Sequence, residues 1–171
     1  MSEAKERQRL RAITFGSLTG FLAMGFGSGL SPKAPGTTGS LAALLLMYPI
    51  ALILPIEWQL LGVVVAFGAG VLICSQAAKA IGTHDHGAIV WDEWVGLWAV
   101  LVLLPFSLDA WLLAFALFRL FDIAKPWPIR WVDQHLHGGL GIMTDDALAA
   151  VFAVLTLLLI GQWWPIEFIW H

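Results

Sequence analysis

Long apolar stretches alternate with short polar segments along most of the chain. Four stretches approach the roughly 20 residues that a helix needs to cross a hydrocarbon core of about 30 Å. They are Ser40–Ile56, Gln59–Ile81, Ile89–Phe121 and Ala147–Trp164. A fifth stretch, Ala12–Met24, is too short to cross. We therefore predict membrane-spanning helices for the long stretches and a short interfacial or re-entrant helix for residues 12–24.

The stretch Ile89–Phe121 is too long for one simple span, and the segment "LLPFSLDA" interrupts it. Proline removes a backbone donor, and the Ser-Leu-Asp that follows offers a helix cap. We therefore predict a helical hairpin with arms at Ala88–Leu104 and Leu108–Ala124, which gives five crossings in total.

The distribution of charge supports the hairpin. With five crossings and the N-terminus inside, all nine basic residues face the cytoplasm: Lys5, Arg7, Arg9, Arg11, Lys33, Lys79, Arg119, Lys125 and Arg130. The opposite turns, near Glu57, Asp109 and Glu167, carry acidic residues and no basic ones. This is the positive-inside pattern. A single long third helix would move Lys125 and Arg130 to the other side, so the hairpin is favoured.

Composition also indicates that lipid is the solvent of this protein. The chain has 171 residues, of which 59% are hydrophobic and only 12% charged, with a mean hydropathy of +0.81. Soluble domains carry about 25% charged residues. We predict an all-α integral membrane bundle that forms one domain over residues 1–171, with residues 1–11 as a charged cytoplasmic arm. Six tryptophans are expected to anchor it at the interfaces: Trp58, Trp127, Trp131, Trp163, Trp164 and Trp170.

The single cysteine, Cys74, lies in an apolar run and is expected to be a buried, inert thiol. One cysteine excludes a disulfide framework and a thiolate metal site. Candidate chemistry is therefore confined to three polar segments, which the predicted topology brings to the same side of the membrane.

The first segment, "GFGSGLSPKAPGTTGSLAA", is rich in glycine and leads into a helix. Glycine allows backbone N–H groups to approach an anion closely, and a helix N-terminus adds partial positive charge. Thr37, Thr38 and Ser40 are candidates either to cap that helix or to bind phosphate oxygens. The nucleotide P-loop is excluded because no Gly-Lys-Ser/Thr follows.

The second segment, "HDHGAIVWDE", combines His84, Asp85 and His86 with Asp92 and Glu93. Hard cations such as Mg²⁺ prefer carboxylate oxygens together with substrate phosphate. Adjacent residues differ by about 100° around a helix, so we expect one ligand from the acidic pair to be joined by carboxylates elsewhere. Zinc is disfavoured because no third histidine or cysteine lies nearby. Carboxylates are expensive at a membrane boundary, which makes this pair a functional candidate.

The third segment, "FRLFDIAKPWPIRWVDQHLHGGLGIMTDDALAA", holds the other charges. Arg119 and Asp122 lie one helical turn apart, and an ion pair between them is the simplest account. Three glycines, at positions 138, 139 and 141, are expected to form a flexible passage. Asp145 and Asp146 are then expected to begin the last helix, where its dipole favours negative charge.

Together the three segments place hydroxyl groups, two acidic pairs, a further aspartate and three basic residues at one membrane face. This set indicates Mg²⁺ and a phosphorylated substrate, with acids holding the metal and basic side chains holding phosphate. A lipid phosphate would meet the site at this depth.

These segments resemble the phosphatidylglycerophosphatase A family of Gram-negative bacteria over about Gly25 to Ala150. The motifs that carry the resemblance are "GFGSGLSPKAPGTTGSLAA", "HDHGAIVWDEWVG" and the third segment quoted above. The resemblance implies an all-helical fold and Mg²⁺-dependent removal of the terminal phosphate of phosphatidylglycerophosphate. It also places the site at the cytoplasmic leaflet of the inner membrane, with a phospholipid and no nucleic acid as partner.

Roles for individual residues follow from this resemblance together with the charge pattern. Asp92, Glu93 and Asp146 are expected to bind metal or activate water, with Asp122 and Asp145 as further metal candidates. Arg119, Lys125 and Arg130 would neutralise the phosphate, assisted by Thr37 and Ser40. His84 or His86 would protonate the departing alkoxide. The chain has neither Cys-x5-Arg nor Asp-x-Asp-x-Thr, so we favour attack by water over a covalent phosphoenzyme.

Two other classes stay open: a divalent-cation transporter and a lipid-binding membrane subunit. A transporter would be expected to place carboxylates at mid-bilayer, whereas here they lie at the ends of the apolar runs. A phospholipid synthase would need a spaced Asp-Gly…Ala-Arg…Gly…Asp…Asp signature, which is absent.

Overall fold

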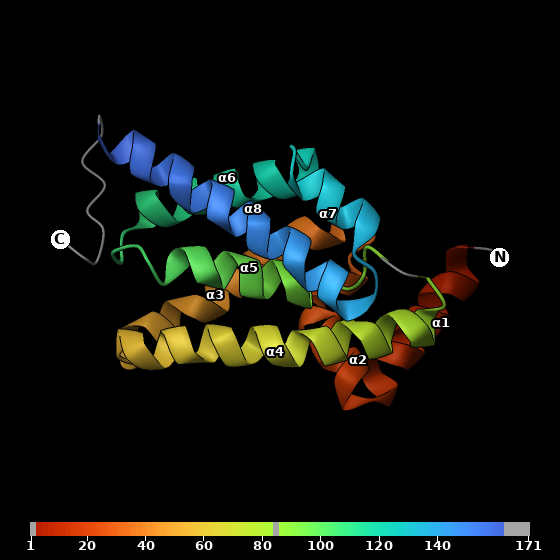
Figure 1. Cartoon of the computed structure of the whole chain (residues 1–171). Coiled ribbons are helices and arrows are strands. Elements are labelled where there is room, and N and C mark those ends of the chain that lie inside the picture. Colours follow the sequence, from red (N-terminus) through yellow and green to blue (C-terminus); the bar gives the residue numbers. More distant parts are fainter. Residues whose placement is uncertain (1–2, 84–85, 163–171) are drawn as a thin grey trace.

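The computed structural model describes residues 3–83 and 86–162, and all regular elements within these ranges are helical (Figure 1). They are α1 (Glu3–Gly16), α2 (Leu18–Ala23), the 3-10 helix η1 (Gly25–Leu30), α3 (Pro35–Ile53), α4 (Ile56–Ile81), α5 (Trp91–Leu101), α6 (Leu108–Ala124), α7 (Ile129–His135) and α8 (Gly138–Gly161). The prediction of an all-α fold is confirmed for this part of the chain.

Among the described residues, three helices are long and apolar enough to cross a membrane: α3, α4 and α8. Large apolar side chains on their outer faces are exposed, among them Leu45, Val64 and Leu159. In water such a surface would be unstable, whereas acyl chains solvate it well. These three helices therefore present the face that a bilayer would cover.

The predicted hairpin is present, but its first arm is shorter than expected. α6 has the predicted bounds, and Ser107 caps it by accepting a hydrogen bond from the backbone N–H of Ala110 at 3.4 Å. α5, in contrast, has 11 residues instead of the 17 predicted. At 1.5 Å per residue its length is about 16 Å, roughly half of a hydrocarbon core. The expected count of five crossing helices therefore stays a prediction, and α5 does not cross by itself.

The charged N-terminal residues are helical. Residues 3–11 lie in α1, which continues to Gly16. The side chain of Ser17 then caps α2, accepting a hydrogen bond from the N–H of Gly20 at 3.0 Å. The short apolar stretch is thus divided between two helices that contact each other and the C-terminal part of α4.

The helices run so that the polar segments meet at one end of the bundle. Figure 1 shows α1, α2 and α7 gathered at the end where α4 and α6 finish and where α3, α5 and α8 begin. All nine basic residues belong to these parts of the chain. The turns that carry Glu57 and Asp109 lie at the opposite end. We call the first the charged end of the bundle.

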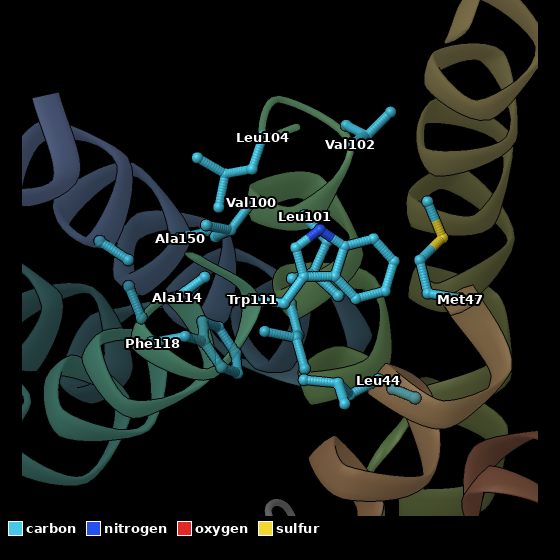
Figure 2. Close-up of a cluster of buried hydrophobic side chains, with 14 of the residues drawn as sticks. Leu44, Met47, Val100, Leu101, Val102, Leu104, Trp111, Ala114, Phe118 and Ala150 are labelled. Carbon is cyan, nitrogen blue, oxygen red and sulfur yellow. The ribbon is translucent and has the colours of Figure 1, made fainter. Parts of the chain in front are cut away.

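The apolar core lies between α3, α5, α6 and α8 (Figure 2). Leu101, Trp111 and Phe118 are each at most 4% exposed and pack with Leu44 and Met47 of α3. Three of the six tryptophans predicted as interfacial anchors lie within the described residues. Trp58, Trp127 and Trp131 are exposed as expected, while Trp163, Trp164 and Trp170 lie outside the described residues. Cys74 is buried, as predicted.

Candidate active site

Three carboxylates from two helices converge at the charged end. Asp92 and Glu93 lie in the first turn of α5 and Asp146 lies in α8, and one oxygen of each falls within 4.8 Å of the other two. The 100° difference led us to expect a ligand from only one member of the adjacent pair, whereas one oxygen of each member lies close to Asp146. We call these three residues the acidic cluster.

The acidic cluster is withdrawn from solvent. Asp92 is 8% exposed, Asp146 is 3% exposed and the side chain of Glu93 is 12% exposed. Glu93 Oε2 and Asp146 Oδ2 are buried without a hydrogen-bond partner among the described residues. A buried unpaired carboxylate is costly, and neighbouring like charges add to that cost. A positive partner would offset this cost, and a hard divalent cation, which prefers oxygen ligands, fits the three carboxylates.

The sequence suggested that Asp145 and Asp146 begin the last helix, but in the structure they do not. α8 starts at Gly138, so both aspartates lie about two turns inside it, beyond the reach of the helix dipole. The glycines that were expected to be flexible are packing positions. A Cβ on Gly139 would lie 1.8 Å from the carbonyl oxygen of Val71 in α4. The absence of a side chain thus lets α8 approach α4 and brings Asp146 into the cluster.

Arg119 in α6 links the acidic cluster to a fourth carboxylate. Its Nη1 lies 3.6 Å from Glu93 Oε1 and also pairs with Asp122, one helical turn away. The predicted ion pair with Asp122 is confirmed, and the contact with Glu93 was not foreseen. The side chains of Arg119 and Asp122 are 13% and 14% exposed. The guanidinium therefore sits at the edge of the cluster, where it can meet an incoming phosphate.

Lys125 forms a second cationic position, held by two carboxylates. Its Nζ donates to Asp145 Oδ2 at 2.6 Å and to Asp133 Oδ1 at 2.7 Å. Burial opposes the charge of this ammonium group, but the two hydrogen-bonded carboxylates outweigh it and raise the pKa of Lys125 above its usual range. Lys125 is therefore charged at neutral pH. Asp145 serves as its partner and lies next to Asp146 in sequence.

Asp133 in α7 is a site residue that the sequence reasoning missed. It lies in the segment "RWVDQH" on the charged side, between Arg130 and the start of α8. The sequence does hold one indication: Asp133 follows Lys125 closely, and the "PWP" between them forces a turn that can bring the two side chains together. Only the packing of α7 on α8 shows that the two side chains meet.

The glycine-rich segment lies against the same cluster. A Cβ on Gly36 would lie 2.2 Å from Glu93 Oε1 and 3.1 Å from the Arg119 guanidinium nitrogens. Glycine at this position therefore leaves room for those two side chains beside the first turn of α3. The start of α3 has Ala34 as its N-cap residue, with no side-chain cap. The prediction that Thr37, Thr38 or Ser40 caps the helix is wrong.

The hydroxyl groups of this segment lie inside α3. Ser40 is fully buried and donates to the carbonyl of Gly36 at 2.8 Å, which favours a packing role over direct contact with substrate. Thr38 likewise donates to the carbonyl of Ala34. Thr37 is partly buried in the first turn, where the uncapped N–H groups lie. Thr37 is thus the better placed of the two predicted phosphate ligands.

The remaining predicted residues lie outside the cluster's contacts. His86 Nε2 is 3.5 Å from Glu6 of α1, and its Nδ1 accepts a hydrogen bond from the N–H of Ala88. Arg130 is exposed in α7. His84 lies outside the described residues. The structure thus brings Asp92, Glu93, Asp146, Arg119 and Asp122 together, with Lys125 and Asp145 beside them.

Comparison with known proteins points to one family. The family model for phosphatidylglycerophosphatase A matches residues 21–161. A phosphatidylglycerophosphatase A of Escherichia coli (strain K12) is 51% identical over 148 residues, which cover 85% of this chain and 84% of the relative. A protein of the same name from Haemophilus influenzae is 45% identical over 159 residues, which cover 92% of this chain and 98% of the relative.

A more distant relative carries a different name. It comes from Bacteroides thetaiotaomicron, is provisionally named a phosphatidylinositol-3-phosphatase, and is 37% identical over 81% of this chain and 90% of its own length. No solved structure matches the chain. The matched range of the family model contains every residue of the acidic cluster, together with Arg119 and Lys125.

Proposed function

This chain belongs to the phosphatidylglycerophosphatase A family, and from this premise we propose that it hydrolyses the terminal phosphomonoester of phosphatidylglycerophosphate. The products would be phosphatidylglycerol and inorganic phosphate. The observation that carries the proposal is the buried acidic cluster with two cationic side chains beside it. The three carboxylates can hold a hard cation, and that cation together with Arg119 and Lys125 could bind a phosphate dianion.

We propose Asp92, Glu93 and Asp146 as the ligands of Mg²⁺. Support comes from their convergence and from Glu93 Oε2 and Asp146 Oδ2, which are buried and have no hydrogen-bond partner in the part of the chain that the structure describes. The preference of Mg²⁺ for carboxylates also supports it. When bound, Mg²⁺ would polarise a phosphoryl oxygen and lower the pKa of a coordinated water. Asp122 and Asp145 already pair with Arg119 and Lys125. They are therefore better explained as holding those cations than as first choices for the metal.

The chain's own cations would bind and orient the phosphate. Arg119 offers a planar fork of donors, which suits phosphate oxygens, and Lys125 offers a positive charge held in place by Asp133 and Asp145. The uncapped first turn of α3 adds N–H groups next to Glu93. Arg130 would meet the phosphate from solvent. These groups stabilise charge that moves onto the phosphate oxygens as the P–O bond breaks.

Water is the proposed nucleophile, and a carboxylate of the cluster would take its proton. The departing glycerol oxygen gains a proton in the same turnover, and His84 or His86 is the predicted donor. Since His86 contacts Glu6 in the structure, α1 would have to release it for this role. The absence of the known nucleophile motifs from the sequence supports direct hydrolysis.

The site is proposed to face the cytoplasmic leaflet of the bacterial inner membrane in a multi-pass protein. Support comes from the gathering of all nine basic residues at the charged end, which the positive-inside rule assigns to the cytoplasm. A lipid phosphate at that leaflet lies level with the ends of the spanning helices.

Phosphate release by the purified protein tests the proposal. Phosphatidylglycerophosphate in mixed micelles should be hydrolysed with Mg²⁺ present, and a chelator should stop the reaction until Mg²⁺ is added back. Phosphatidylinositol 3-phosphate in a parallel arm tests the head group, and we expect it to react more slowly. If neither lipid released phosphate with Mg²⁺ present, the enzyme proposal would be contradicted and a transporter or a binding subunit would be favoured.

A further inference from the structure

An apolar crevice lies between α4, α5 and α8. These three helices pack against one another and run alongside each other in Figure 1. It has a volume of about 210 Å³. Its walls include Val63, Val64 and Phe67 of α4, Ala99 of α5, and Met143 and Ala147 of α8. No charged residue lines it. A crevice of this kind has room for a segment of hydrocarbon chain and excludes water.

The crevice lies next to the acidic cluster. Ala147 follows Asp146 directly, and Met143 precedes it by one helical turn. On α5, Ala99 lies two turns beyond Asp92, toward the opposite end of the bundle. A molecule with its phosphate at the acidic cluster would therefore find the crevice by extending away from the charged end, into the depth of the membrane.

The mouth of the crevice faces the apolar outer surface. Val64 is 69% exposed and belongs to α4, one of the three helices long and apolar enough to cross a membrane. Ala99 and Ala147 are small, so the walls on α5 and α8 leave space where larger side chains would fill it. An acyl chain can thus enter sideways from the bilayer without crossing any polar group.

We propose that this crevice holds one acyl chain of the phospholipid substrate while its phosphate lies at the acidic cluster. The inference rests on the proposed function and deepens it. A lipid tail in the bilayer is already in an apolar solvent, so moving it into the crevice gains little hydrophobic free energy. The crevice instead orients the substrate through close packing and aligns the phosphate with the cluster. It should therefore influence turnover of long-chain lipids and not of short-chain ones.

Two neighbouring valines provide a matched test. Val64 lines the crevice and Val65 does not, and both side chains are largely exposed on α4. Val64→Phe should lower kcat/KM about 5–20-fold for phosphatidylglycerophosphate with long acyl chains, because the ring blocks the mouth. The same variant should stay within about twofold of wild type on an analogue with very short chains. Val65→Phe should match wild type on both substrates.

A second pair of variants tests another wall of the crevice. Ala99→Leu fills the crevice from α5, whereas Ala116→Leu makes the same change on the exposed face of α6. Selective loss of long-chain turnover in Val64→Phe or Ala99→Leu supports the proposal. Equal losses on long and short chains, or no loss in either variant, would overturn it.

A measurement without turnover separates this inference from the proposed function. A non-hydrolysable phosphonate analogue of phosphatidylglycerophosphate with a photoreactive group in its acyl chain is incubated with the wild-type protein and Mg²⁺ and irradiated, and the labelled peptides are identified. The proposal is supported if the α4 and α5 walls are labelled, if excess unlabelled analogue suppresses this labelling and if phosphatidylcholine does not. This result would support the crevice even if hydrolysis fails. Labelling confined to other surfaces, or suppressed equally by both lipids, would overturn it.

Discussion

The charged end of the bundle and its apolar core are built from the same helices in opposite ways. In the core, Leu101, Trp111 and Phe118 bury apolar surface against many neighbours, and no single contact is indispensable. At the charged end, α5, α6 and α8 bury carboxylates and cations whose partners are few and defined. The core thus contributes stability, while burial of like charges at the charged end is expected to cost stability and to serve chemistry.

This division explains why the two regions should respond differently to substitution. Truncating a buried apolar side chain lowers the free energy of unfolding roughly in proportion to the volume removed. Buried like charges, in contrast, already oppose folding, so removing one can leave stability unchanged or increase it. Measurements of stability and activity on the same variants should therefore separate the two regions.

The largest effect is expected from the acidic cluster. Asp92→Asn, Glu93→Gln and Asp146→Asn should each lower kcat/KM by about 10³-fold, because each amide weakens the proposed metal site and removes a proton acceptor. The melting temperature in detergent should stay level or rise. Asp109→Asn and Glu57→Gln at the opposite end are the matched controls and should retain full activity. Full activity in all three cluster variants would show that the chemistry lies elsewhere.

The core should show the reverse behaviour. Leu101→Ala removes a side chain that is 1% exposed and should lower the free energy of unfolding by about 2–5 kcal/mol. The activity of the folded fraction should change little. Leu155→Ala alters a 52% exposed position on α8 and should be nearly neutral. Equal losses of stability in the two variants, measured by thermal unfolding, would mean that Leu101 is not a core residue.

Substitution of Arg119 should have an intermediate effect on activity, because this residue pairs with acids and is also proposed to bind phosphate. Arg119→Gln should reduce kcat/KM by about 100-fold, and Arg119→Lys by about tenfold, since lysine keeps the charge but loses the planar fork. Lys79→Gln, at the charged end but outside the site, is the control. If Arg119→Lys and Arg119→Gln were equally impaired, geometry rather than charge would account for the role of Arg119.

Asp133 should give the smallest effect. Asp133→Asn leaves Lys125 with Asp145 as its charged partner and should raise KM about 3–5-fold, with kcat nearly unchanged. Lys125→Ala should raise KM more than Asp133→Asn does. Adding Asp133→Asn to Lys125→Ala should then change KM no further, because the interaction between the two residues is already lost. Additive losses in the double variant would contradict the positioning role.

The sequence predicted the helical class, the break near Pro105 and most residues of the candidate site. The bounds of α6 were predicted correctly because Pro105 and the Ser107 cap act locally. The length of α5 and the start of α8 at Gly138 were missed, since close packing decides them. Gly139 reads as flexible in sequence, yet in the fold it is the position at which α8 approaches α4.

The same limit applies to the site residues. Adjacent acids in a helix predict divergent side chains, and only the approach of α8 shows that Asp92 and Glu93 share one point with Asp146. The pairing of Lys125 with Asp133 also depends on the packing of α7 on α8. Residue types were thus predictable, whereas their partners required the tertiary structure.

The central claim is that the acidic cluster binds a divalent cation. Titration of the purified protein with Mn²⁺ as a paramagnetic substitute for Mg²⁺, followed by electron paramagnetic resonance, tests it directly. We expect wild type and Glu57→Gln to bind Mn²⁺ equally, with Mg²⁺ as a competitor, and Glu93→Gln and Asp146→Asn to lose that binding. Unchanged binding in both cluster variants would contradict the claim.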